Sequence, residues 1–127
     1  MGGNAQKIYR GLIPILAISY FGAASFHLLD VFDLRLHFSQ MDLLEKTWTL
    51  YSLFADILVG IALVSRTRAG ELLFVTILLA KIAVYLGWSD ALGNQYGWVG
   101  FHLATLGAYL VFLTNVARPE PHLFQRE

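Results

Sequence analysis

The chain has 127 residues, enough for one domain, and 57% of them are hydrophobic while only 14% are charged. Ordinary soluble domains carry about 25% charged residues, so the composition excludes a typical water-soluble protein and indicates one that lies in lipid. The formal net charge is zero, which argues against a nucleic-acid partner, because phosphates require a basic face. The chain has no cysteine, which excludes disulfides and thiolate chemistry.

Four apolar segments are each long enough to cross a bilayer as an α-helix. A helix rises about 1.5 Å per residue, so about 20 residues span a hydrocarbon layer of about 30 Å. The segments cover roughly residues 11–29, 47–65, 70–88 and 98–117. We therefore expect an all-α protein, with a single membrane domain over residues 1–127 that folds as an antiparallel four-helix bundle.

The first apolar segment is expected to remain in the protein as a span. It has a basic start at Lys7 and Arg10, as a signal peptide does, but Asp30 follows the apolar run directly without a small-residue cleavage site. Pro14 lies early in this segment and is expected to bend or start the helix.

The connections between the segments differ in length. The longest is the outer loop 30–46, where apolar and polar residues alternate from Phe32 to Phe38, a period of two that predicts an extended or interfacial segment. Ser39 is expected to cap the next helix, with Asp42 in the third position of a capping box. Residues 66–69 form a very short turn, which makes the second and third segments antiparallel neighbours.

The basic residues predict the orientation of the bundle, because Lys and Arg are retained in the cytoplasm during insertion. Six basic residues fall on one side, namely Lys7, Arg10, Arg66, Arg68, Arg118 and Arg126. Two, Arg35 and Lys46, fall on the other side. We therefore expect a prokaryotic inner (plasma) membrane protein with both termini in the cytoplasm. The outer boundary also gathers aromatic residues that are typical of the headgroup level, namely Trp48, Trp88, Tyr96 and Trp98.

Small residues predict the faces along which the helices pack, because helices in lipid associate by close approach. Three groups of small residues stand out, one in each of three segments: Gly22, Ala23 and Ala24; Ser52, Asp56 and Gly60; Gly100, Ala104 and Ala108.

Asp56 and Lys81 are ionisable residues inside predicted spans, where a charge is costly unless it faces the bundle interior. They lie at depths of about 13 Å and about 10 Å below the outer boundary, on neighbouring helices. This intramembrane polar pair either carries a proton or a substrate near the midplane, or is a structural pair that fixes the helix register. The structural interpretation is favoured, because complementary charges satisfy each other.

His27 and His102 form a second candidate site, because both lie near the outer boundary of the predicted bundle. Each shares a helical stripe with a tyrosine seven residues away, His27 with Tyr20 and His102 with Tyr109. Thr105 joins the second stripe.

The two histidines are compatible with three ligands. They could ligate a b-type haem, bind a transition metal with help from Asp30 or Asp33, or hydrogen-bond a quinone. The quinone contact is favoured over haem and metal, while local hydrogen bonding of each imidazole at the interface is the simplest interpretation.

Two stretches of the sequence resemble the DoxX-like family of small four-span membrane proteins: RGLIPILAISYFGAASFHLL and ADILVGIALVSRTRAGELL. The resemblance covers about residues 10–117. It places Arg10 and Arg66 at flanking basic positions, Asp56 at the family's acidic position, where glutamate is usual, and His27 at a polar position where lysine is common. It implies a small membrane subunit of an oxidoreductase system, such as thiosulfate:quinone oxidoreductase.

Three classes of function follow. The first, implied by the resemblance, is an auxiliary or anchor subunit of a quinone-linked membrane redox complex. The second is a small proton- or solute-coupled carrier that uses Asp56 and Lys81 and must oligomerise to enclose a path. The third is a structural or assembly subunit of a larger membrane complex. Catalysis by the chain alone is not expected, because it has no nucleophile motif and electron transfer needs a bound cofactor. The expected partners are the lipid bilayer and other membrane subunits or further copies of the chain.

Overall fold

A computed structural model describes residues 2–92 and 95–116, which fold into helices with no β-strand among them. The elements are α1 (Gly2–Val31), the short 3-10 helix η1 (Phe38–Gln40), α2 (Leu43–Ser65), α3 (Arg68–Gly87), the one-turn helix α4 (Ser89–Leu92) and α5 (Tyr96–Val116). The predicted all-α class is therefore confirmed. The end of the predicted fourth span at Ala117, and Arg118 and Arg126 of the orientation prediction, lie outside the described residues.

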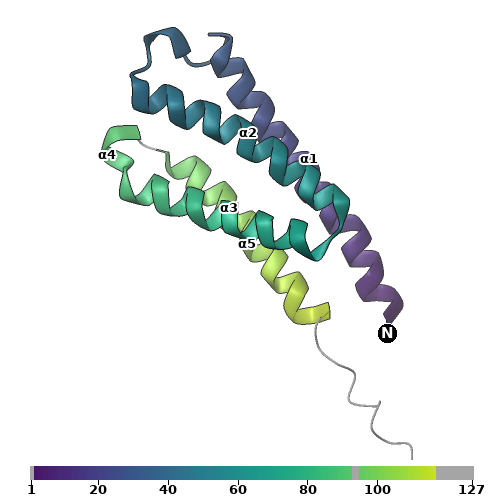
Figure 1. Cartoon of the computed structure of the whole chain (residues 1–127). Helices are drawn as coiled ribbons and strands as arrows, with labels where there is room; N and C mark the ends of the chain where they lie inside the picture. The colour runs from purple at the N-terminus through teal and green to yellow at the C-terminus, as the bar shows by residue number, and fades with distance from the viewer. Residues whose placement is uncertain (1, 93–94, 117–127) are drawn as a thin grey trace, which may run out of the picture.

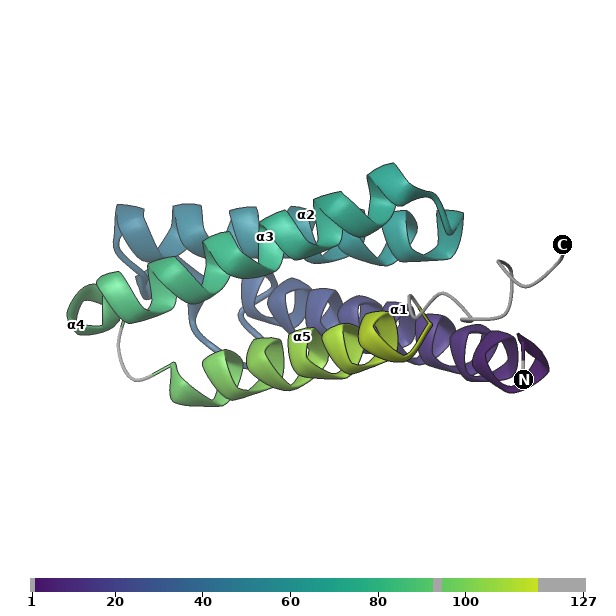
Figure 2. The ribbon, with the colours of Figure 1, turned by 90° about the horizontal axis from the view of Figure 1, so that it is seen from below.

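The four long helices form an antiparallel bundle, as predicted. α1 packs along α2, α2 against α3, α3 against α5 and α5 against α1, which closes a ring of four neighbours. The pairs α1–α2 and α3–α5 lie on opposite sides of the bundle in Figure 1, and the view from below separates α2 and α3 from α1 and α5 (Figure 2). Each helix therefore presents one face to the bundle interior and another to its surroundings.

All four long helices are long and apolar enough to cross a membrane, over Arg10–Val31, Leu43–Ser65, Arg68–Gly87 and Tyr96–Leu113. Each one turns large apolar side chains outward: Ile18, Phe54, Leu72 and Val111 are between 62% and 70% exposed. Exposing such apolar surface to water is unfavourable, whereas hydrocarbon accepts it. The fold is therefore that of a membrane protein.

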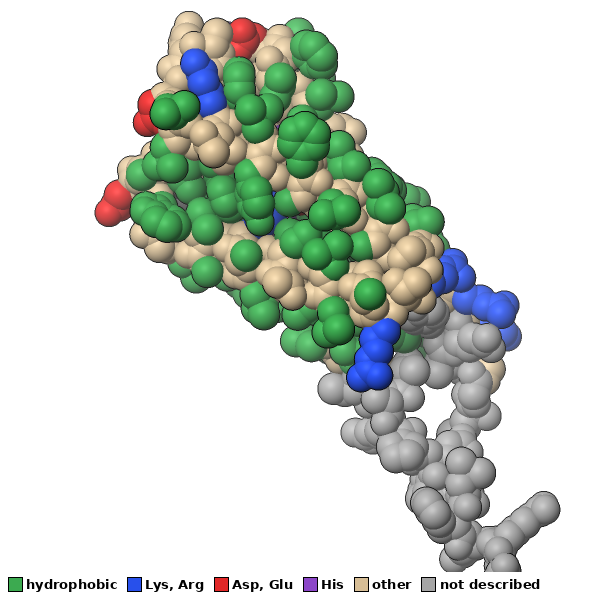
Figure 3. All heavy atoms as spheres, viewed as in Figure 1, with side chains coloured by type: hydrophobic (Ala, Val, Ile, Leu, Met, Phe, Trp, Pro, Cys, Tyr) green, Lys and Arg blue, Asp and Glu red, His purple; other side chains and the backbone are tan. Residues whose placement is uncertain are grey.

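The two ends of the bundle differ in charge. Figure 3 shows hydrophobic side chains along the visible face, and Lys and Arg side chains gathered at one end. Asp and Glu side chains lie at the opposite end, which also carries basic side chains. We call the first the basic end, which carries Lys7, Arg10, Arg66 and Arg68. We call the second the loop end, which consists of residues 32–42, α4 and the start of α5.

The entry into α2 differs from the prediction. Its N-cap is Asp42 and not Ser39: the Asp42 carboxylate accepts from the amide of Glu45 at 2.8 Å, and the Glu45 carboxylate accepts from the amide of Asp42 at 3.0 Å. This is a complete capping box, shifted three residues along the chain. Glu is the preferred residue at the third position, which explains why the later register is the one that forms.

The outer loop is not extended, so that part of the prediction is wrong. The chain reverses at Asp33, which has the left-handed φ of 57°, and then forms η1. The amide of Ser39 donates to the Asp33 carboxylate at 2.8 Å and holds the pKa of Asp33 below its ordinary value. These local hydrogen bonds fold the loop back instead of leaving it extended. Asp33 can take the reversing conformation because Asp tolerates the left-handed region.

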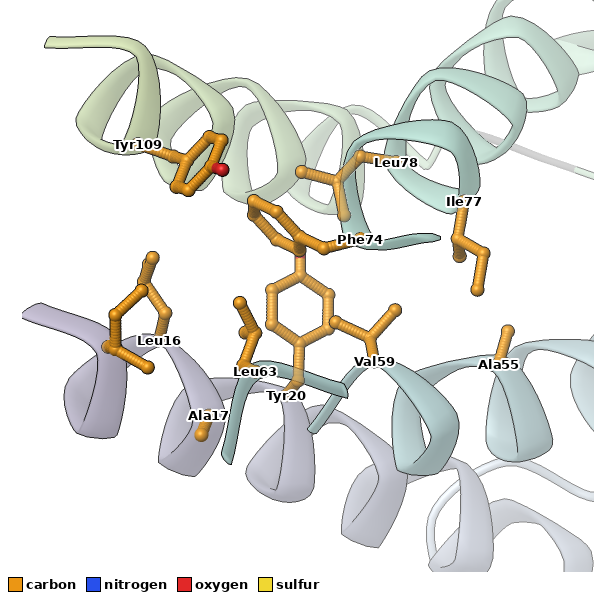
Figure 4. Packing of buried hydrophobic residues seen from close by; sticks show 11 residues of the cluster. Leu16, Ala17, Tyr20, Ala55, Val59, Leu63, Phe74, Ile77, Leu78 and Tyr109 are labelled. Atoms are coloured by element: carbon orange, nitrogen blue, oxygen red, sulfur yellow. The ribbon is translucent and has the colours of Figure 1, made fainter. Parts of the chain in front are cut away.

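Tyr20 lies at the centre of the main hydrophobic core, with its ring between the other three helices (Figure 4). Phe74 meets Tyr20 edge-on, with ring centroids 5.7 Å apart, and Tyr109 meets Phe74 in the same way at 5.2 Å. Such edge-to-face contacts are favourable beyond their buried area. The core is completed by aliphatic residues from α1, α2 and α3, namely Ile13, Leu16, Ala17, Ala55, Val59, Leu63, Ile77 and Leu78.

The small residues of α1, α2 and α5 are not all buried, although the prediction placed them at helix–helix contacts. Ser52, Asp56 and Gly60 on α2 are buried, and so are Ala23 and Ala24 on α1, whereas Gly22 is exposed. The prediction for α5 is wrong, because Gly100, Ala104 and Ala108 all face outward. The buried stripe of α5 consists of larger side chains with helical spacing, namely Val99, His102, Thr105, Tyr109 and Phe112.

Gly70 sits where the α2–α3 turn brings the two backbones together, so adding a side chain there should destabilise the bundle. A Cβ at Gly70 would meet the carbonyl oxygen of Ala62, which is backbone and cannot rotate away. We expect Gly70→Ala to cost about 1–3 kcal/mol of unfolding free energy, measured by denaturant titration in detergent micelles. Gly100→Ala is the matched control, because its Cβ would meet nothing within 4 Å. Equal stability of the two variants would contradict this packing.

Candidate functional site

The buried pair Asp56 and Lys81 joins α2 to α3. The Lys81 ammonium donates to Oδ1 of Asp56 at 2.6 Å, and both side chains are completely buried. The short α2–α3 connection allows this contact: α2 ends at Ser65, Arg66 follows it in the left-handed conformation (φ 53°), and Thr67 caps α3 immediately afterwards. The structure therefore brings together the two ionisable residues that the sequence places inside spans.

His27 extends the buried pair onto α1. Its Nε2 lies 3.5 Å from Oδ2 of Asp56, and its Nδ1 lies 3.8 Å from Oδ2 of Asp30. Neither Nε2 of His27 nor Oδ2 of Asp56 has a hydrogen-bond partner, although both atoms are buried. The imidazole is therefore held between two carboxylates, one on its own helix and one on α2.

Asp30 is fixed by the outer loop. The Arg35 guanidinium donates to both of its carboxylate oxygens, with Nε 2.8 Å from Oδ1 and Nη2 2.6 Å from Oδ2, and the amide of Leu36 donates to Oδ1 at 3.2 Å. Such bidentate pairs are among the strongest hydrogen-bonded contacts in proteins. Asp30 is 1% exposed, whereas the Arg35 side chain is 35% exposed.

Together these residues form a continuous series in which basic and acidic side chains alternate. We call it the charge chain, and it consists of Arg35, Asp30, His27, Asp56 and Lys81, in that order from the loop end inward. From the sequence, Arg35 was assigned only to the outer basic residues. Its partner Asp30 is five residues away, a spacing at which helical side chains do not face each other, so helical periodicity could not predict the contact. Only the reversal at Asp33 brings Arg35 back to the end of α1.

His102 belongs to a separate hydrogen-bonded group. The hydroxyl of Tyr20 lies 3.1 Å from Nδ1 of His102 and 2.9 Å from Oγ1 of Thr105, and the Thr105 hydroxyl donates to the His102 carbonyl at 3.0 Å. All three side chains are buried, and Nε2 of His102 has no hydrogen-bond partner. The group ties α1 to α5 at mid-bundle.

The histidine–tyrosine pairs differ from those that the helical spacing predicts. Tyr20 bonds to His102 across the bundle and not to His27 on its own helix, and Tyr109 packs against Phe74 in the core. The two imidazoles are instead linked by Trp98, whose ring stacks on both of them. The ring centroids lie 4.9 Å apart for Trp98 and His27 and 6.4 Å apart for Trp98 and His102. Trp98, expected as a boundary anchor, is therefore also part of the site.

The residues considered as candidate metal ligands are arranged differently from a metal centre. Among the described residues, no group of three or more His, Asp or Glu side chains is placed to hold a metal ion. Asp30 accepts both hydrogen bonds of Arg35, and Asp33 accepts from the amide of Ser39. These carboxylates are thus engaged in shaping the loop end.

A pocket of ≈ 280 Å³ lies above the charge chain at the loop end. His27 and Asp30 line it, whereas Asp56 and Lys81 do not. The rest of its wall is mostly polar or aromatic and comes from the outer loop and the ends of the other helices: Arg35, Leu36, His37, Gln40, Met41, Glu45, Trp48, Thr49, Tyr85, Leu92, Gln95 and Trp98.

A second cavity, a groove of ≈ 580 Å³, runs between α1 and α5. Its wall is largely apolar, and no side chain occupies the space beside Gly22 or Gly97. The groove shares Arg35, Gln95 and Trp98 with the pocket, so the two cavities adjoin each other. The remaining groove residues are Ser19, Ala23, Phe26 and Phe101.

No family model matches the sequence, and neither a curated protein nor a solved structure matches it. The basis for a functional proposal is therefore the site itself: a pocket lined by polar and aromatic side chains over a buried histidine, beside a largely apolar groove between α1 and α5.

Removing one charge of the Asp56–Lys81 pair should destabilise the protein more than removing both charges. Lys81→Met leaves the Asp56 carboxylate buried without its cation, and we expect it to cost about 3–5 kcal/mol. The double variant Asp56→Leu/Lys81→Met removes both charges and should recover most of that loss, because apolar residues of similar volume replace a buried pair well. Denaturant unfolding in micelles measures both. A double variant no more stable than the single one would contradict the pairing.

Proposed function

We propose that this chain is a small integral membrane subunit that binds a quinone-type amphiphile at its loop end, as an auxiliary component of a quinone-linked redox complex. The observation that carries the proposal is the junction of the two cavities at Arg35, Gln95 and Trp98. An amphiphile needs a polar cavity for its head and an apolar one for its tail, next to each other. Sites for small molecules have volumes of about 300–1,000 Å³, and these two together fall within that range.

The chemistry of the pocket fits a neutral, planar head group. A quinone ring carries carbonyl oxygens that accept hydrogen bonds, and His27, Arg35 and Gln95 supply donors around the pocket. The indole of Trp98 offers a flat surface for a ring to stack on. Asp30 and Glu45 also line the pocket, so an anionic phosphate head would meet carboxylates there and is disfavoured.

The groove fits the tail of the same ligand. Ala23, Phe26 and Phe101 form an apolar wall between α1 and α5. An apolar chain in this groove would be in contact with protein on one side and with lipid on the other, so it could enter from the bilayer without crossing water.

The wider context of the proposal comes from the resemblance to DoxX-like proteins and from the charge of the two ends. The resemblance supports a partner that is a larger redox subunit of the membrane, or further copies of the chain. The basic end carries Lys7, Arg10, Arg66 and Arg68, which supports an orientation with this end in the cytoplasm of a prokaryotic inner membrane. The pocket would then open on the outer face.

A substitution that fills the groove should weaken quinone binding without unfolding the protein. We expect decylubiquinone to bind wild type saturably, and Gly22→Leu to weaken binding at least about tenfold, because the leucine occupies the space of the tail. Native mass spectrometry from mild detergent measures the bound quinone. The same spectra show whether a larger redox subunit co-purifies.

The matched control for this prediction is Gly11→Leu, on the same helix but outside both cavities, where a Cβ also meets nothing within 4 Å. It should bind as wild type does. Absence of a quinone adduct in wild type, or equal weakening by both substitutions, would contradict the proposal. A chain that purifies without any redox partner would limit the proposal to the binding of the quinone.

A further inference from the structure

We propose that His27 is a proton-exchange residue, which takes up a proton from the loop-end pocket and holds it beside the buried Asp56–Lys81 pair. The proposal is carried by the geometry of the charge chain and by the access that the pocket gives to it. It does not depend on which ligand fills the pocket.

The charge chain is arranged to accept one additional proton. Asp30 and Asp56 each have a basic partner, Arg35 and Lys81, so these four charges cancel and the chain is neutral while His27 is neutral. A neutral imidazole has only one N–H, so one of its two nitrogens presents a lone pair to a carboxylate. A protonated imidazole has two N–H groups, one for Asp30 and one for Asp56. Protonation thus gives each carboxylate a donor from the imidazole, in addition to the one from Arg35 or Lys81.

The distances around His27 agree with such a role. Its nitrogens lie 3.8 Å and 3.5 Å from the nearest carboxylate oxygens, longer than formed hydrogen bonds. The partnerless atoms on the Asp56 side, Nε2 of His27 and Oδ2 of Asp56, are the two that face each other. A proton placed between them would satisfy both buried atoms at once.

Access to the charge chain is one-sided. His27 lines the loop-end pocket, whereas Asp56 and Lys81 lie beneath it. Toward the basic end, the next turns of α2 and α3 contribute Val59, Leu63, Phe74 and Leu78, which are buried in the core. These apolar side chains offer a proton no partner. His27 both lines the pocket and lies against the Asp56 carboxylate, so it connects the pocket directly to the buried pair.

The proton transfer itself involves no redox change. A hydronium ion or an acidic O–H group in the pocket gives up its proton, its O–H bond breaks, and an N–H bond forms on the imidazole while the electron pair stays on oxygen. The charge chain changes from neutral to one positive charge. The titratable and charged groups that surround His27 come from every neighbouring element: Asp30 on α1, Arg35 and His37 in the loop, Glu45 and Asp56 on α2, Lys81 on α3 and His102 on α5.

The test is an NMR titration of histidine side chains in the purified full chain in bilayers, without added quinone. We expect the imidazole of His27, assigned with His27→Gln, to change protonation state reversibly. In Asp56→Leu/Lys81→Met, which removes the acceptor on α2 together with its cation, His27 should take up its proton at least about one pH unit lower, a tenfold loss of proton affinity. Asp90→Asn, which removes an exposed carboxylate of α4 outside the pocket, should leave the titration unchanged.

Two results would overturn the proposal. One is a His27 imidazole in wild type that stays in one protonation state at every pH at which the protein remains folded. The other is a folded double variant in which His27 titrates as it does in wild type, because the Asp56 carboxylate would then play no part. The wild-type titration decides the first point even when the variant does not fold. Since no quinone is present, failure here leaves the quinone proposal untouched, and the reverse also holds.

Discussion

The structure depends on a single constraint, which is that the charges of Asp56 and Lys81 must be kept out of lipid. A charge in hydrocarbon costs several kcal/mol, and a buried ion pair is tolerated only when its geometry is good. The 2.6 Å contact between the two side chains therefore fixes how α2 and α3 face each other. His27 adds α1 to the same point, because its Nε2 faces the free oxygen of Asp56.

Around this pair the bundle is divided into two halves. The half toward the basic end is an apolar core centred on Tyr20 and Phe74, which supplies packing. The half toward the loop end holds the pocket and the adjoining groove. The charge chain leads from Arg35, at the wall of the pocket, inward to Lys81. A ligand in the pocket would thus be next to His27, while the ion pair stays dry. The two proposed roles, proton exchange and quinone binding, would therefore share the wall of one pocket, through His27 and Arg35.

The hydropathy of the sequence was sufficient to predict four helices and their antiparallel order, since lipid requires long apolar helices and short turns enforce neighbours. The same reasoning singled out Asp56, Lys81, His27 and His102, because polar residues inside spans are rare. The partners of these residues were harder to predict, since they depend on helix rotation and loop conformation. Tyr20 bonds to His102 across the bundle, Arg35 reaches Asp30 only after the turn at Asp33, and α5 buries its larger stripe and not its small one.

The direct contact between Asp56 and Lys81 is the feature on which the other contacts of the charge chain depend. Solid-state NMR on the protein in lipid, with labels on the side-chain nitrogen of lysine and the carboxylate carbon of aspartate, measures this contact directly. Assignment with the double variant Asp56→Leu/Lys81→Met identifies the signal. We expect a strong dipolar coupling between Nζ of Lys81 and the carboxylate carbon of Asp56, as an Nζ–Oδ1 distance of 2.6 Å requires. A Lys81 nitrogen without any coupling to an aspartate carboxylate would contradict it.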